Sequence, residues 1–279
     1  MDLLDQLAQE LKVNKKERSV ISRLGFFSKP FRMTAKDGQE WVVKTYKAIR
    51  NTRLIDQIIQ NHKDYVEAMQ KIGVKIPHTE IHTLGQQGKK QLVILQAPYQ
   101  QEELVRGIME TAQQDQFLEI LGLLLEDTLQ FWLNKNDQEI GFHPTLRNYA
   151  LRDGALFYFD TFPPMLMPQQ QLNGIIVEMA PVKLNMRPFI PLSAINRVSD
   201  EYYEKDKMLI GIIGSCCRLR PEFTEAVLNF AQAFIQNHAL LNDREKSSLI
   251  TKIMAPPKLP AIWVFIRKLL GKQGKPNIK

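Results

Sequence analysis

Two neighbouring stretches decide how this chain folds: Gly141-Phe142-His143-Pro144-Thr145-Leu146-Arg147-Asn148 and Phe157-Tyr158-Phe159-Asp160-Thr161-Phe162. Between them, Arg152-Asp153-Gly154 is a turn sequence flanked by apolar residues, so residues 149–159 predict a short hairpin. Asn148 and Asp160 then stand at the two ends of one hairpin. Amide and carboxylate oxygens are the ligands that hard cations such as Mg²⁺ prefer. The pattern favours a metal site here over the alternative that both residues serve only as turn formers.

The residues before Pro98 predict a small sheet with two helices. Leucines at helical spacing predict a helix over residues 3–12. A helix over residues 52–72 is expected to end at Gly73. Turn signals at 36–39 and 85–90 separate stretches of strand character. Five strands are therefore expected, at residues 20–27, 31–34, 41–46, 80–84 and 91–96.

After Pro98 the pattern becomes helical. Apolar residues recur at spacings of three and four over residues 101–111, 114–134 and 194–253. Residues 163–192 are rich in proline and methionine, which predicts a long irregular loop. The chain is therefore expected to have an α+β fold with two lobes. The lobes are a small antiparallel β lobe over residues 1–97 and a helical lobe over residues 98–254, and a basic amphipathic tail over residues 255–279 follows them.

Composition narrows the function classes. Of the 279 residues, 44% are hydrophobic and 24% are charged, as is typical of globular proteins. The N-terminus lacks the pattern of a signal peptide, and no apolar run approaches the ~20 residues that span a bilayer. Two adjacent cysteines, Cys216 and Cys217, cannot build a disulfide framework. We therefore expect a cytoplasmic protein.

The net charge of +7 is concentrated near the end of the sequence, because residues 255–279 contain six basic side chains and no acidic one. Residues 262–279 combine Trp, Phe and Leu with lysine and arginine. This predicts either a peripheral contact with an anionic membrane surface or a final helix packed on the helical lobe. No nucleic-acid-reading motif accompanies the charge, so nucleic acid is not an expected partner.

The order of these elements resembles the protein-kinase-like superfamily, closest to its aminoglycoside and small-molecule phosphotransferase branch, over about residues 19–240. Lys44 ends a Val-Val-Lys strand, from which a lysine can reach phosphates as a point charge. The resemblance implies a nucleotide between two lobes, ATP and Mg²⁺ as cofactors, and Asn148 and Asp160 as metal ligands. It also implies that Gln96 lies in the adenine-binding segment, and that Glu67, or alternatively Asp64, pairs with Lys44.

The sequence departs from the family pattern at the position of the catalytic aspartate, where it has His143. An imidazole with a pKa near ~6.5 could accept a hydroxyl proton. Arg147 could contact a phosphate or a substrate anion. The Gly25–Pro30 loop also has one glycine where the family has three. Three functions remain open: a phosphotransferase that acts on a small hydroxylated molecule or a protein with His143 as base, a pseudokinase that recruits a partner or a membrane, and an adenylyltransferase with a reoriented nucleotide.

Overall fold

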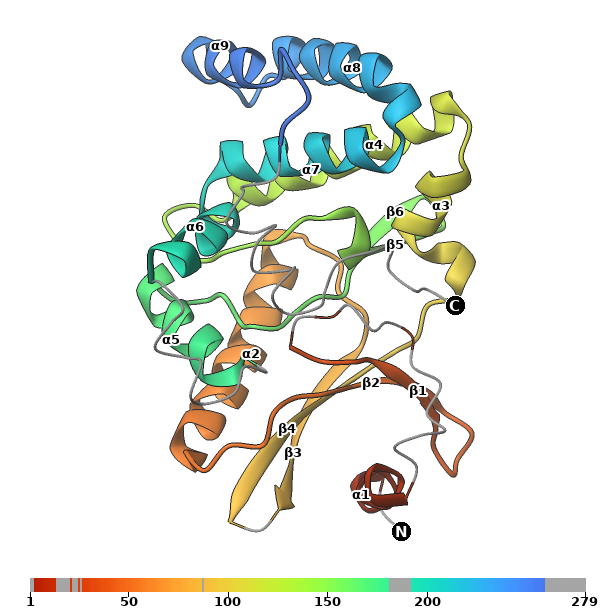
Figure 1. Cartoon of the computed structure of the whole chain (residues 1–279), viewed down its shortest axis with the longest axis vertical. Coiled ribbons are helices and arrows are strands. Elements are labelled where there is room, and N and C mark those ends of the chain that lie inside the picture. Colours follow the sequence, from red (N-terminus) through yellow and green to blue (C-terminus); the bar gives the residue numbers. More distant parts are fainter. Residues whose placement is uncertain are drawn as a thin grey trace.

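The computed structural model describes residues 3–13, 21, 25, 27–86, 88–180 and 192–258. It has the expected α+β class, with a small antiparallel sheet at one end and a larger helical part at the other (Figure 1). Helix α1 (Leu3–Val13) precedes the sheet. The four strands lie in the order β1 (Phe31–Thr34), β2 (Glu40–Thr45), β4 (Lys89–Gln96), β3 (Thr79–Gln86), and all neighbours are antiparallel.

Helix α2 (Thr52–Ile72) connects β2 to β3 and has the predicted bounds. It begins after Asn51, whose side-chain oxygen accepts a hydrogen bond from the Leu54 amide at 3.1 Å. It ends at Gly73, which has a φ of 106° and caps the last turn through its backbone amide. Glycine is favoured there because a side chain is strained at that φ.

The two faces of the sheet pack into different cores, because side chains alternate along a strand. Val43, Val93 and Leu95 face α1 and form a small core with Leu7. Ile94 belongs to the opposite face, in a core shared with α2 and the helical part. Lys44 is the antiparallel partner of Ile94, so its side chain also points toward that shared core.

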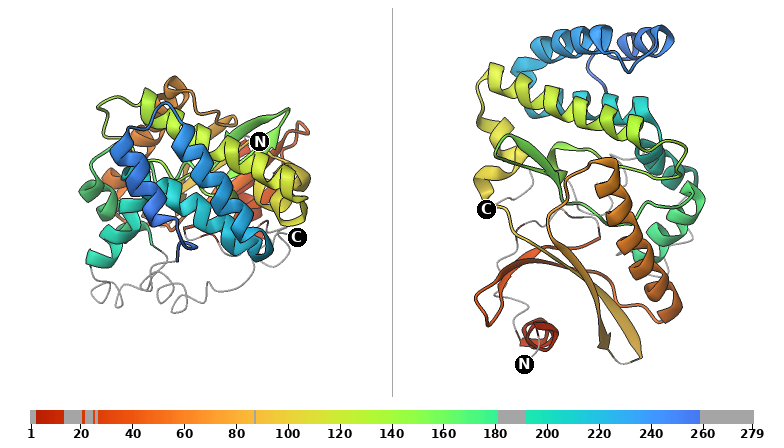
Figure 2. Two further views of the ribbon diagram at one scale, coloured as in Figure 1. Left: turned by 90° about the horizontal axis from the view of Figure 1, so that it is seen from above. Right: turned by 180° about the vertical axis from the view of Figure 1, so that it is seen from behind.

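After Pro98, the regular secondary structure of the described residues is helical except for one hairpin. Figure 2 shows α4 and α7 crossing over the hairpin on the side away from the sheet, with α8 and α9 beyond them. The bounds, in chain order, are a 3₁₀ turn η1 (Gln101–Glu103), α3 (Val105–Thr111), α4 (Gln114–Asn134), η2 (Leu146–Asn148), β5 (Tyr149–Arg152), β6 (Ala155–Tyr158), α5 (Gln169–Met179), α6 (Leu192–Tyr203), α7 (Lys205–Leu219), η4 (Pro221–Phe223), α8 (Thr224–Asn237) and α9 (Asp243–Lys252).

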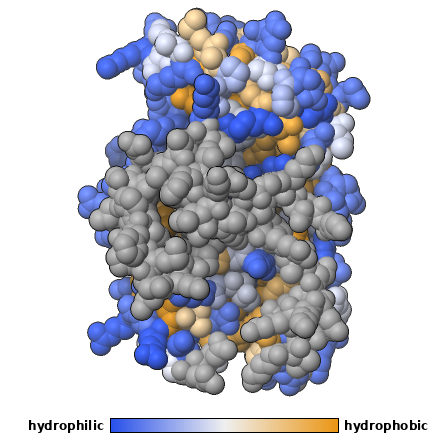
Figure 3. Space-filling view, viewed as in Figure 1, coloured by the Kyte–Doolittle hydropathy of each residue, from blue (hydrophilic) through white to orange (hydrophobic). Residues whose placement is uncertain are grey.

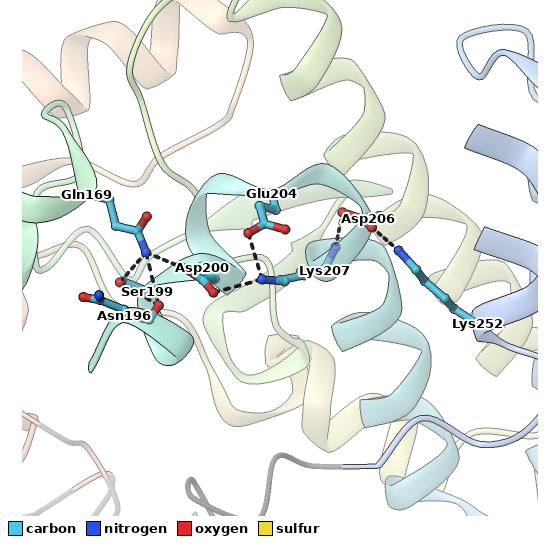
Figure 4. A network of polar contacts seen from close by, with 8 residues as sticks. All are labelled: Gln169, Asn196, Ser199, Asp200, Glu204, Asp206, Lys207 and Lys252. Carbon is cyan, nitrogen blue, oxygen red and sulfur yellow. Dashed lines mark hydrogen bonds and ion pairs between the residues drawn. The ribbon is translucent and has the colours of Figure 1, made fainter. Parts of the chain in front are cut away.

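The prediction of an irregular loop over residues 163–192 is wrong in part, because α5 occupies its middle. A polar network holds this helix against α6 (Figure 4). The Gln169 amide donates to the Asn196 carbonyl oxygen, the Ser199 hydroxyl and the Asp200 carboxylate, at 3.1, 2.8 and 2.6 Å. Lys207 then bridges Asp200 to Glu204 at 2.9 and 2.8 Å. The network fixes α5 on the helical part.

Two other expectations fall largely on residues that the structure does not describe. Of the strand expected at 20–27, Ile21, Gly25 and Phe27 are described, and none of them is in a strand. The amphipathic segment at 262–279 lies outside the described residues, so its predicted membrane contact stays a prediction.

The surface of the described part carries few large apolar side chains. Only Leu133 and Met254 are exposed among its large hydrophobic residues. In Figure 3 the end of the molecule formed by α8 and α9 is mainly hydrophilic, with scattered hydrophobic residues. Among the described residues, none of the helices combines the length and the apolar composition needed to cross a membrane.

Candidate functional site

The site is built around the backbone of Phe159, at the end of the β5–β6 hairpin. The Phe159 amide donates to the Asn148 carbonyl oxygen at 3.0 Å and so continues the hairpin ladder by one residue. The carbonyl oxygen of Phe159 accepts a hydrogen bond from the Lys44 amine at 2.7 Å. Asp160 follows directly. This junction brings Lys44 of the sheet close to Asp160, and it pairs the Asn148 backbone with the residue before Asp160.

Lys44 reaches this point because β2 directs it into the shared core, where it is only 8% exposed. Its amine also lies 5.5 Å from the centre of the Phe159 ring. Burial lowers the pKa of Lys44, and the nearby negative charge of Asp160 offsets part of that shift. An ammonium group that donates one hydrogen bond to a carbonyl oxygen has two further N–H groups that could bind an anion.

Burial shifts the pKa of Asp160 in the direction opposite to that of Lys44. Burial raises the pKa of its carboxyl group, while the positive charges of Lys44 and Arg147 counteract the shift. Arg147 itself is exposed, one residue before Asn148. The ionised carboxylate therefore depends on its cationic neighbours, and a bound cation would favour it further.

Asn148 is 5% exposed and faces His143 across the loop. Its side-chain NH₂ donates to the His143 backbone oxygen at 3.0 Å and lies 3.4 Å from the His143 Nδ1. These contacts determine which way the amide points, so the oxygen Oδ1 is the atom that could coordinate a cation. His143 also packs on the ring of Tyr202, with centroids 4.5 Å apart. Burial lowers the pKa of His143 to about 4, and Arg147 adds to the shift.

The donor set fits Mg²⁺. An amide oxygen and a carboxylate are hard ligands, and Mg²⁺ usually takes one or two such protein ligands and completes its shell with water and phosphate oxygens. The described residues contain no group of three or more His, Cys, Asp or Glu side chains arranged to hold a metal. A cation held by Asn148 and Asp160 would accordingly take its remaining ligands from a substrate and from solvent.

Glu67 and Asp64 are not brought to Lys44. Glu67 lies on the exposed face of α2 and pairs with Lys71, one turn along, at 2.6 Å. Asp64 accepts a hydrogen bond from Gln60 at 2.8 Å. The residue that α2 directs into the site is His62, whose Nε2 lies 2.9 Å from the Thr161 hydroxyl. Its pKa is lowered to about 3 by burial and by the charge of Lys44.

Sequence reasoning missed His62 and Thr161. A signal was present, because the buried residues of α2 follow a helical stripe and His62 falls on it. Glu67 falls off that stripe, which explains its exposure. The stripe consists of Ile55, Ile58, His62, Tyr65, Met69 and Ile72.

Gln96 shares the sheet face of Lys44, since it opposes Val42 in the same register that pairs Lys44 with Ile94. It is buried, and its amide nitrogen donates to the Thr79 hydroxyl at 3.0 Å. Its role in adenine binding stays a prediction.

The Gly25–Pro30 loop approaches the site through Phe27. The Phe27 ring packs edge-on against Phe162, with centroids 5.4 Å apart, and the Tyr46 ring packs on Phe162 at a tilt of 41°, with centroids 4.1 Å apart. A Cβ atom on Gly25 would lie 2.2 Å from the Ser28 carbonyl oxygen. This glycine therefore serves the tight path of the loop itself, whatever the loop binds.

A family model matches almost the whole chain, over residues 3–274. The chain belongs to a protein family of unknown function, DUF6206. None of the curated proteins compared with this DUF6206 chain matches it. Among solved structures, it is similar to one described as WaaP in complex with acyl carrier protein. The two share 10% identity with a TM-score of 0.43, over 81% of this chain and 82% of that chain.

Proposed function

We propose that this DUF6206 chain binds a nucleoside triphosphate with Mg²⁺ between its sheet and its helical part, as a kinase-like phosphotransferase. The observation that carries the proposal is the junction at Phe159, which joins the Lys44 amine to the segment bearing Asn148 and Asp160. Phosphoryl transfer requires little more than a cation on the phosphates, oxygen ligands for Mg²⁺ and a group that orients the acceptor. The chain offers a residue for each role.

The electrostatics support binding. Lys44 and Asp160 both carry pKa values shifted by burial toward their neutral forms. A phosphate beside Lys44 and a cation beside Asp160 would each favour the charged form of its neighbour. When bound, Mg²⁺ would neutralise charge on the phosphate oxygens. Lys44 would bind phosphate, and Asn148 and Asp160 would orient the cation.

In the transfer reaction, an acceptor hydroxyl oxygen would attack the terminal phosphorus, and the nucleoside diphosphate would leave with the electrons of the broken bond. The hydroxyl proton would pass to an unprotonated ring nitrogen of His143. With a pKa of about 4, this imidazole is neutral near pH 7 and about as weak a base as a carboxylate. It would therefore first orient the hydroxyl and would accept the proton late, as the new bond to phosphorus makes the hydroxyl acidic.

One observation favours a second candidate, nucleotide binding without transfer. The Asn148 NH₂ faces the Nδ1 of His143, so in the neutral ring the proton belongs on Nε2. An Nε2–H group donates a hydrogen bond and cannot accept a proton. In that tautomer the ring could hold a bound nucleotide, or a reoriented one, but could not act as a base toward a hydroxyl at Nε2.

Isothermal titration with Mg·ATP tests the proposal. We expect wild type to bind, Asp160→Asn to bind at least about tenfold more weakly, and Asp153→Asn to match wild type. Asp153 is a suitable control because it lies at the exposed turn of the same hairpin, at a φ of 51° that asparagine tolerates. Equal affinities in all three proteins, or no binding by wild type, would contradict the proposal.

The two candidates differ in how they respond to His143→Asp. Phosphate transfer that wild type performs and the variant loses or slows supports His143 as the orienting group. Transfer that appears only in the variant supports a wild-type protein that binds the nucleotide without transferring phosphate.

A further inference from the structure

His62 and Thr161 form a buried hydrogen bond across the shared core. They lie 99 residues apart in the sequence, and their exposed fractions are 1% and 0%. A buried polar side chain that is left without its hydrogen-bond partner destabilises the folded protein. Each side chain therefore needs the other, and the bond ties the middle of α2 to the segment after the hairpin.

The position of Thr161 gives this bond a consequence for the site. Thr161 follows Asp160 directly, so a fixed Thr161 side chain restrains the peptide that carries the Asp160 carboxylate. On the other side of Asp160, the Phe159 carbonyl oxygen is held by Lys44 at 2.7 Å. The aspartate is therefore clamped from both neighbours, by the sheet through Phe159 and by α2 through Thr161.

We propose that His62 is a positioning residue, which acts through Thr161 to hold Asp160 in the orientation that binds Mg²⁺. The inference rests on the proposed function. In this arrangement α2 contributes an uncharged hydrogen-bonding side chain to the site, in place of the carboxylate that was expected to pair with Lys44. The Lys44 charge then remains for the phosphates, with Asp160 as its acidic neighbour in the site. Partners that orient a ligating carboxylate commonly contribute 10- to 100-fold to metal affinity.

Isosteric pairs of variants separate positioning from packing. Thr161→Val keeps the shape and removes the hydroxyl, whereas Thr161→Ser keeps the hydroxyl. His62→Leu removes the hydrogen bond, whereas His62→Gln places an amide near the position of Nε2. The measurement is the dissociation constant of ATP with Mg²⁺ and with EDTA, for each variant and for wild type.

We expect Thr161→Val and His62→Leu to weaken Mg·ATP binding by about 10- to 100-fold, with ATP affinity in EDTA within about twofold of wild type. Thr161→Ser and His62→Gln should stay within about threefold of wild type in both conditions. Unchanged Mg·ATP affinity in Thr161→Val, or an equal loss with and without Mg²⁺, overturns the inference. If wild type itself does not bind Mg·ATP, the proposed function fails, and this inference fails with it.

A measurement on wild type keeps the inference testable if the His62 variants do not fold. The ¹⁵N resonances of the His62 ring are recorded in protein saturated with ATP, before and after Mg²⁺ is added. We expect the Nε2 resonance to shift, because the cation acts on Asp160 and Thr161 transmits the change. A shift confined to His78, with none at His62, overturns the inference. His78 is an exposed histidine whose Nε2 contacts Glu80 at 3.0 Å.

Discussion

Asp127 on α4 should destabilise the native protein at neutral pH, and Asp127→Asn should relieve that cost. Its carboxylate accepts a hydrogen bond of 2.7 Å from the hydroxyl of Tyr149, the first residue of the hairpin. Burial raises the pKa of Asp127 from 3.8 to about 6, although the Tyr149 hydrogen bond and the charge of Lys75 counteract the shift. Asparagine keeps an acceptor for Tyr149 and carries no charge.

The sign and size of the effect follow from that pKa. Because the folded-state pKa lies above the unfolded value, the native state binds the proton more tightly. The contribution of Asp127 is therefore most favourable below pH 3.8 and is lost as the pH rises through 6. A difference of about two pKa units corresponds to about 3 kcal/mol at most. Since the side chain is only half-buried, solvent screening reduces this to about 1–2 kcal/mol.

The assay is urea unfolding of wild type, Asp127→Asn and Asp127→Ala at pH 5 and pH 7.5. Asp127→Asn should be more stable than wild type by about 1–2 kcal/mol at pH 7.5 and by less at pH 5. Asp127→Ala should be less stable than the asparagine variant at both pH values, because it leaves the buried Tyr149 hydroxyl without its acceptor. An asparagine variant that gains nothing at pH 7.5, or a gain that is the same at pH 5, would refute the reasoning.

Three further predictions concern the site and its supports. Lys44→Met should destabilise the nucleotide-free protein by about 1–3 kcal/mol, because it leaves the Phe159 carbonyl oxygen without its donor and the Asp160 carboxylate without a cationic neighbour. The same variant should lose the stabilisation of about 3 kcal/mol that Mg·ATP gives at 100 times its dissociation constant, and a persisting thermal shift would count against the proposed phosphate contact. Gly141→Ala should destabilise by about 1–3 kcal/mol in urea unfolding, since its Cβ would lie 2.9 Å from the Tyr203 ring and 3.0 Å from the Tyr202 carbonyl oxygen. Gly174→Ala on α5, where the added Cβ would meet no atom within 4 Å, should instead stabilise the protein by up to about 1 kcal/mol. If Gly174→Ala is the more destabilising of the two glycine variants, the contacts at Gly141 do not decide the outcome. Burial raises the thiol pKa of Cys216, so native protein should resist a thiol reagent at this residue at pH 8 and react once unfolded; rapid labelling of the native protein would disprove this.

The sheet, the hairpin and α2 could be predicted because their signals are local. The turn at Arg152-Asp153-Gly154 and the apolar residues on either side fix the hairpin, and the hairpin fixes the approach of Asn148 to Asp160. Likewise, Gly73 marks the end of α2 through a φ that few other residues adopt. The contact between Lys44 and Phe159 spans 115 residues. No local pattern contains that contact, and the family resemblance implied only that Lys44 and Asp160 face a common nucleotide.

The misses also have physical causes. The prediction from the sequence missed helix α5 because prolines favour loops, although Pro168 lies directly before the helix. Proline suits the residues next to a helix, where the backbone amide needs no partner within the helix. The family resemblance implies an acidic partner for Lys44, whereas the buried stripe of α2 directs His62 inward. Helical periodicity was the better guide there, because burial is set by the face on which a residue lies.

The central claim is that Lys44, Asn148 and Asp160 surround the phosphates of a nucleotide. A crystal structure of the protein with Mg²⁺ and a non-hydrolysable ATP analogue tests it most directly. We expect the Lys44 amine within hydrogen-bonding distance of a phosphate oxygen, and Mg²⁺ held by the Asn148 Oδ1 and the Asp160 carboxylate at about 2.0–2.1 Å. A nucleotide bound elsewhere, or one whose phosphates contact none of these three side chains, would contradict it.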